Sequence, residues 1–229
     1  MQLRRWHSYA TPDALAEAAL AAILAAARQA IAARGTFHLV LAGGMTPKKV
    51  YQKLAAADAD WPSWWVYFGD ERCLPVADVE RNSRMADDAW LAHRPIPATQ
   101  IFPIAGECGA TAAAAAYALQ LARVEQFDLV LLGLGEDGHT ASLFPGLIEV
   151  AEQRATVAVF NAPKPPAERV SLSARRLAAT RQLIFLAGGA SKRAAVHAWR
   201  QGVAIPAAAI APACGVDIYL EASALEPVA

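Results

Sequence analysis

The side chains best suited to acid–base chemistry lie in a glycine-rich segment, Gly135-Glu-Asp-Gly-His-Thr-Ala-Ser-Leu-Phe-Pro-Gly146. This segment follows an apolar run, Phe127–Gly133, which predicts a buried strand. Asp137 and His139 are therefore expected on a tight turn at the carboxyl end of a strand, where α/β sheets bind ligands. An imidazole can take and return a proton near neutral pH, and a nearby carboxylate can hold it in one tautomer. We predict that His139 is a general base and that Asp137 orients it.

The same segment argues against three other chemistries. Gly133–Gly138 matches the G-x-G-x-x-G dinucleotide pattern, but Pro145-Gly146 stops the long helix that this pattern requires. Two acidic residues within the pattern would also repel a pyrophosphate. Ser142 lacks the G-x-S-x-G turn of a serine nucleophile, so water is the expected nucleophile. No second histidine lies at ligand spacing, and no metal site is predicted.

A candidate anion site follows the strand predicted at 37–42. Gly43 and Gly44 permit a sharp turn and a close approach of the backbone to a ligand. Thr46 is a plausible N-cap and Pro47 fits the first helical position. The N–H groups at such a helix start favour a phosphate. An ordinary strand–turn–helix junction would have the same sequence pattern.

A second junction, Leu186–Arg193, repeats this layout: a strand, two glycines, a hydroxyl residue, and Lys192 at a helix start. Lys192 offers a point charge suited to a phosphate. A lysine near a helix start is also commonly a solvated surface residue, so the repeat alone does not decide the question.

Two further segments place polar residues next to strands. Asp70-Glu71-Arg72 follows the strand predicted at 64–68, where Arg72 offers a bidentate fork to phosphate and Asp70 can accept hydrogen bonds from sugar hydroxyls. A surface turn with a local salt bridge is the alternative. Arg169 begins another strand; it suits either a contact with substrate or a salt bridge at the sheet edge.

Apolar and amphipathic segments alternate along the chain, which predicts an α/β fold with a largely parallel sheet and helices on both faces. The Pro-rich segment Ala162–Ala167 is interpreted as a rigid surface loop, so residues 1–229 are predicted to form a single domain. Strands are predicted at 37–42, 64–68, 99–104, 128–132, 156–160, 169–172, 182–187 and 217–220. Helices are predicted near 13–34, 47–57, 81–93, 110–125 and 191–201.

The amino-acid composition excludes some classes of binding partner. Lys and Arg number 21, as do Asp and Glu, so the formal net charge is zero, and neither a nucleic-acid nor a membrane partner is expected. The three cysteines are widely spaced and fit a reducing cytoplasm. Arg4-Arg5 precede Ala-rich sequence, but Pro12 and the charges after it favour an amphipathic helix over an export signal. We expect a cytoplasmic monomer.

Taken in order, these motifs resemble the 6-phosphogluconolactonase family, hydrolases of the oxidative pentose phosphate pathway. The resemblance covers almost the whole chain, through GG-x-T-P at 43–47, D-E-R-C-x-P at 70–75, the segment at 133–146, R-V-S-L at 169–172 and G-x-x-K at 189–192. It implies a Rossmann-like fold of the sugar-phosphate isomerase type, no cofactor, and 6-phosphoglucono-1,5-lactone as substrate. It implies His139 as the general base beside Asp137. The expected substrate-binding residues are Gly43, Gly44, Thr46, Asp70, Arg72, Arg169 and Lys192.

The sequence departs from the family's motif at one loop, and two alternative functions remain. The family's loop often reads Ser-Gly-Gly-Ser-Thr-Pro, whereas this chain has Ala42 and Met45 at the serine positions. Glucosamine-6-phosphate deaminases share the fold and a G-E-D-G-H segment, but they typically carry D-E-Y in place of Asp70-Glu71-Arg72. A non-catalytic sugar-phosphate sensor on the same fold would not need His139.

Overall fold

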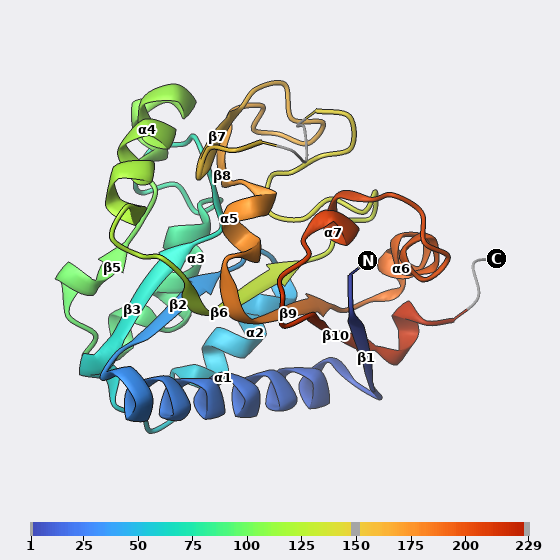
Figure 1. Ribbon diagram of the computed structural model, residues 1–229, viewed down its shortest axis with the longest axis horizontal. Coiled ribbons are helices and arrows are strands. Elements are labelled where there is room, and N and C mark those ends of the chain that lie inside the picture. The colour runs from blue at the N-terminus through green and yellow to red at the C-terminus, as the bar shows by residue number, and fades with distance from the viewer. Residues whose placement is uncertain (1, 148–151, 227–229) are drawn as a thin grey trace.

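Residues 2–147 and 152–226 are described by a computed structural model, in which seven strands form a fully parallel sheet (Figure 1). Both faces of this sheet are covered, which explains why its central strands are apolar throughout. The sequence analysis found all of these strands except β1. In spatial order they are β1 (Arg4–Tyr9), β10 (Val216–Glu221), β9 (Thr180–Ala187), β6 (Phe127–Gly133), β2 (Phe37–Leu41), β3 (Trp64–Phe68) and β5 (Ile101–Phe102).

Three more strands form a second, antiparallel sheet in the order β4 (Asp70–Arg72), β8 (Arg169–Leu172) and β7 (Thr156–Val159). The sequence analysis predicted β7 and β8 as strands and a largely parallel sheet, but it did not predict a second sheet, and it missed β4. Alternation of strand and helix favours parallel pairing only when a helix connects the strands, and β7 and β8 are joined by a loop instead.

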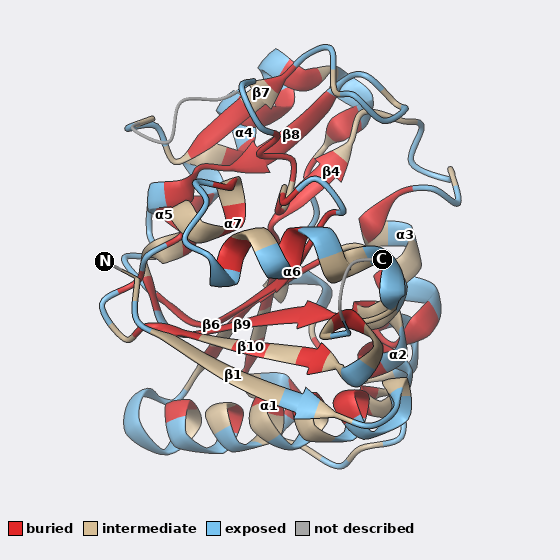
Figure 2. Ribbon diagram, turned by 90° about the vertical axis from the view of Figure 1, so that its right-hand side faces the viewer, coloured by how far each residue is buried: buried red, intermediate tan, exposed pale blue. Residues whose placement is uncertain are grey.

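Helices cover the parallel sheet on both sides, with α1 below it and α6 and α7 above it in Figure 2. Helix α4 packs against β7 and β8 and so closes the second sheet. The helices are α1 (Pro12–Arg34), α2 (Met45–Leu54), α3 (Asn82–Ala89), α4 (Ala110–Leu121), α5 (Ala174–Ala178), α6 (Arg193–Arg200) and α7 (Pro206–Ala209).

The local sequence determines where helix α1 begins and ends. The Thr11 side chain accepts a hydrogen bond from the Ala14 N–H at 3.1 Å, Pro12 occupies the first turn, and Gly35 ends the helix with a φ of 77°. By length and composition α1 is the one helix among the described residues that could cross a membrane. Its Leu15, Ala19 and Ile23 are buried, and it packs against β1, β2, β6 and β10. We interpret it as a core helix.

The functional site is positioned by the order of the strands. The chain moves from β2 to β3 in one direction along the sheet and from β6 to β9 in the other, so the order reverses between β2 and β6. Ligands of open α/β sheets bind beyond the carboxyl ends of the strands at such a reversal. The loops after β2, β3, β6 and β9 all leave from this edge and carry the motifs described above.

Candidate active site

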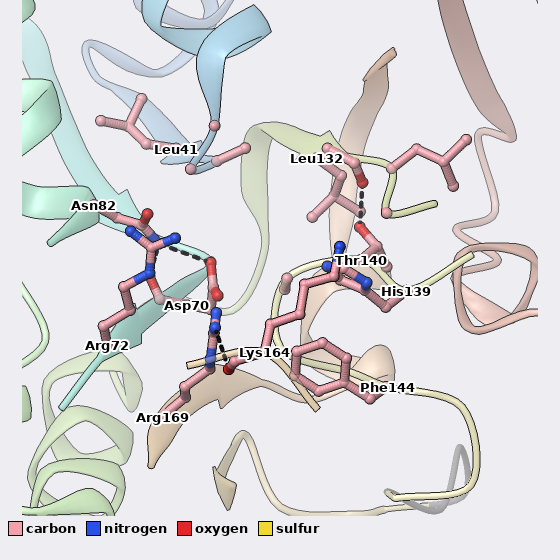
Figure 3. Close-up of a pocket in the computed structure, with 18 of the residues that line it drawn as sticks. Leu41, Asp70, Arg72, Asn82, Leu132, His139, Thr140, Phe144, Lys164 and Arg169 are labelled. Carbon is pink, nitrogen blue, oxygen red and sulfur yellow. Dashed lines mark hydrogen bonds between the residues drawn. The ribbon is translucent and has the colours of Figure 1, made fainter. Parts of the chain in front are cut away.

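A cavity of about 330 Å³ lies at this edge, between the parallel sheet and the antiparallel one. Its lining includes most of the residues expected to bind substrate or act as base: Gly43, Gly44, Asp70, Arg72, His139, Arg169 and Lys192. Thr46 and Asp137 do not line it. Asp137 contacts the His139 ring, and Thr46 lies beside Gly188 in the neighbouring loop. Motifs separated by up to 149 positions in the sequence therefore converge here (Figure 3).

The His139 ring is fixed by Asp137. The ring Nδ1 lies 2.5 Å from Asp137 Oδ1, and the backbone N–H of His139 donates to the same oxygen at 3.1 Å. Burial alone would raise the pKa of Asp137, but these hydrogen bonds lower it below its usual value. An ionised Asp137 accepts a hydrogen bond from Nδ1–H, which keeps the proton on Nδ1 and leaves the Nε2 lone pair available; this is the tautomer a general base needs.

Two glycines of this turn have no room for a side chain, and Gly135 is the one that faces the imidazole ring. A Cβ on Gly135 would lie 2.6 Å from His139 Cγ and closer still to Nδ1 and Cε1. Gly138 adopts a φ of 83°, and a Cβ there would lie 2.7 Å from the Cβ of Ile205. The ring also rests on Phe144, with centroids 4.6 Å apart. The glycine-rich sequence of this turn thus makes room for the imidazole.

The loop after β2 differs in detail from the sequence analysis. Helix α2 starts at Met45 with Gly44 as its N-cap, at a φ of 107°, so the prediction of Thr46 as N-cap is wrong. Only a glycine adopts that φ readily. A Cβ on Gly43 would lie 2.7 Å from Asn82 Cγ, so this loop is compact and packs against the start of α3.

Arg72 has the properties of an anion ligand. It lines the cavity, and its Nη1 donates to the carbonyl of Glu80. Its Nε is buried and has no hydrogen-bond partner among the described residues. An unpaired buried N–H of a cation is costly, and the guanidinium fork as a whole suits a bidentate contact with an anion.

Asp70 is held by two side chains in the protein interior. Its Oδ2 accepts a hydrogen bond from Ser142 Oγ at 2.6 Å, and its Oδ1 accepts one from Asn82 Nδ2 at 3.0 Å. The first of these ties the His139 turn to β4 of the second sheet. The adjacent Glu71 is fully buried and caps α3 by accepting from the N–H groups of Asn82 and Ser83, each at 2.8 Å.

Arg169 is 7% exposed and forms no salt bridge among the described residues. Its Nε donates to the Pro166 carbonyl at 3.2 Å, and its Nη2 donates to the carbonyls of Lys164 and Pro165 at 3.0 and 3.1 Å. The guanidinium also lies 5.6 Å from the centroid of the Phe144 ring. Arg169 therefore fastens the Pro-rich loop to the cavity wall.

The second Gly-Gly junction is not a copy of the first. A short 3₁₀ turn, Ala190–Lys192, precedes α6, and the Gly189 N–H donates to the carboxylate of Glu221 at 2.8 Å. The Gly189 N–H is therefore already paired with a carboxylate. Lys192 is half-buried, and burial lowers its pKa, although the negative charges of Glu136 and Asp137 oppose this effect.

The predicted site did not include Asn82, Ser142 or Lys164. Asn82 and Lys164 line the cavity, and Ser142 is fully buried beneath it. The signal for Lys164 was its place in a rigid loop just before Arg169. Within residues 2–147 and 152–226, no group of three or more His, Cys, Asp and Glu side chains is arranged to hold a metal ion. The three cysteines are free.

Comparison with known proteins agrees with this geometry. Residues 10–219 match the family model described as glucosamine-6-phosphate isomerases/6-phosphogluconolactonase. The chain belongs to this family. It is 37% identical over 203 residues to a 6-phosphogluconolactonase of Streptomyces coelicolor, covering 80% of this chain and 78% of the relative. It is also 37% identical over 214 residues to that of Mycobacterium tuberculosis, covering 86% and 87%.

Among solved structures, the 6-phosphogluconolactonase of Trypanosoma brucei superposes on the full length of both chains, with a TM-score of 0.90 and 28% identity. A monomeric glucosamine-6-phosphate deaminase superposes with a TM-score of 0.84 over 96% of this chain and 98% of its own, at 18% identity. The second likeness shows the fold alone. The α/β fold expected from the family resemblance is confirmed.

Proposed function

We propose that this protein hydrolyses 6-phospho-D-glucono-1,5-lactone to 6-phospho-D-gluconate, as a cofactor-independent enzyme of the oxidative pentose phosphate pathway. The observation that carries the proposal is the His139–Asp137 pair at the wall of a cavity that also contains Arg72, Arg169 and Lys192. The 37% identity to proteins named as this lactonase supports it.

In the proposed reaction, Arg72 and the Gly43–Gly44 loop hold the phosphate, which carries roughly −1.5 to −2 charges near neutral pH by analogy with phosphorylated side chains. His139 Nε2 takes a proton from a water molecule, and the water oxygen attacks C1 of the lactone. The C1–ring oxygen bond then breaks, and the protonated His139 gives its proton to the departing oxygen. Asp137 stabilises the imidazolium between these steps.

Two assays test this function. Purified protein is mixed with freshly generated lactone, and acid release is followed above the spontaneous rate; in parallel, ammonia release from glucosamine 6-phosphate is measured. We expect acid release without ammonia. The reverse result would make the protein a deaminase, and no turnover of either compound would favour a sensor.

The His139→Ala variant tests the base itself. Loss of a general base typically costs about 10²–10⁴-fold, so kcat should fall by that order while the thermal unfolding temperature stays near that of the wild type. A near-normal kcat would remove His139 from the mechanism.

We also propose that residues 1–229 form one domain and act as a monomer in the cytoplasm, without a nucleic-acid or membrane partner. The hydrophobic side chains of both sheets and of α1 belong to one continuous core, which supports the first point. The free cysteines suit a reducing compartment.

A further inference from the structure

Three backbone N–H groups of the His139 turn are already engaged in hydrogen bonds. The Gly135 N–H donates to the His139 carbonyl at 2.7 Å, and the Gly138 N–H donates to the Gly135 carbonyl at 3.1 Å. The His139 N–H is bound to Asp137. An oxyanion formed at C1 of a lactone needs a hydrogen-bond donor close to the base, and a cationic side chain from another segment can supply one.

Lys164 is placed to be that donor. Its side chain leaves the Pro-rich loop between β7 and β8 and runs toward the His139 turn across the cavity (Figure 3). Its Nζ lies 4.0 Å from Glu136 Oε2, next to Asp137 on that turn. This distance exceeds hydrogen-bond length, so the ammonium donors are available to a substrate.

The Lys164 loop and the base share one support. Arg169 holds the loop by donating to three consecutive carbonyls, those of residues 164, 165 and 166. The same guanidinium packs over the Phe144 ring, which lies against the His139 imidazole. Arg169 thus fixes the position of the Lys164 backbone relative to His139, although the Lys164 side chain is 51% exposed.

We propose that Lys164 is the oxyanion donor of the lactone hydrolysis and that Arg169 is a positioning residue acting through it. This inference rests on the proposed function. As the water oxygen bonds to C1, the electron pair of the C1 carbonyl moves onto its oxygen, and the Lys164 ammonium donates a hydrogen bond to that oxygen without losing its proton. The pair returns when the C1–ring oxygen bond breaks and His139 protonates the leaving oxygen.

A comparison of two substrates tests the proposal. Removing one oxyanion donor typically lowers kcat about 10²–10³-fold. The variant Lys164→Met should show this loss, with KM little changed, on both the phosphorylated lactone and plain glucono-1,5-lactone, because both form the same oxyanion. Lys164→Arg should recover part of kcat. The matched variant Lys192→Met, on the opposite sheet, should lose kcat/KM mainly on the phosphorylated substrate.

Lys53→Met is the surface control, since Lys53 pairs only with Asp13 and Glu17 on α1 among the described residues, and its rates should match the wild type. A loss in Lys164→Met confined to the phosphorylated lactone would make Lys164 a phosphate ligand and overturn the proposal. Wild-type rates in Lys164→Met would overturn it as well while leaving the lactonase function intact. An inactive wild-type protein would instead refute the proposed function.

Discussion

Replacing Gly135 by alanine should inactivate the enzyme by moving the base rather than removing it. The new Cβ would lie 2.6 Å from His139 Cγ, whereas ordinary contact begins near 3.4 Å. The nearest ring atom, Nδ1, would lie only 2.0 Å away, so the ring must shift by more than about 1 Å, which breaks its alignment with Asp137; a misplacement of about 1 Å can cost about 10²-fold. We expect kcat for the phosphorylated lactone to fall by about 10²–10⁴-fold, where the upper limit is complete loss of the base.

A double mutant separates this mechanism from general damage. If Gly135→Ala acts only through the ring, it should add almost nothing to the loss already present in His139→Ala, because residues in contact are non-additive. Initial rates of acid release and thermal unfolding would be measured for both single variants and for the double variant. A Gly135→Ala enzyme with kcat within twofold of the wild type, or a fully additive double mutant, would refute this reasoning.

Three further outcomes are expected. Arg72→Ala should raise KM for the phosphorylated lactone far more than for glucono-1,5-lactone, as measured by steady-state kinetics. Ser142→Ala removes the donor to buried Asp70 and should lower the free energy of unfolding by about 1–3 kcal/mol, as measured by urea denaturation. Burial would raise the pKa of Asp217, but its bonds to Arg5 and His7 lower it. The resulting stabilisation is complete above the unfolded pKa of about 3.9 and is lost as pH falls through the lower folded pKa. An Asp217→Asn variant should therefore be less stable than wild type at pH 7, and the difference should shrink as the pH falls below about 3.9.

The strands of the central sheet could be predicted because burial on both faces leaves a continuous apolar run, as in β6. Strand β1 could not, because it lies at the sheet edge and its sequence, Arg4–Tyr9, is half polar. Strand β4 has three residues and ends in charged side chains. Its existence depends on pairing with β8, about a hundred positions away, and no local pattern reports such a partner.

The contact between His139 and Asp137 was predictable because the two residues lie two positions apart on a glycine turn, and the role of His139 as the base stays a prediction. The cap of α3 was not predictable, because the capping carboxylate belongs to Glu71, eleven residues before the helix start. Lys164 was missed for a similar reason: a proline-rich segment has the composition of an ordinary surface loop, and only the hydrogen bonds from Arg169 turn it toward the cavity. The local sequence identified the chemical groups, whereas long-range packing decides which of them lie next to one another.

The division of the site between two sheets has a consequence for how its specificity can change. The base, the Gly43–Gly44 loop and Lys192 follow strands of the parallel sheet, whereas Arg72, Arg169 and Lys164 come from the small antiparallel sheet. Strands β7 and β8 form a hairpin that is contiguous in the sequence, and neither strand pairs with a strand of the parallel sheet. Exchange of that hairpin, by recombination or by design, would replace Lys164 and Arg169 in a single step, while Arg72 on β4 and the His139 turn would stay in place.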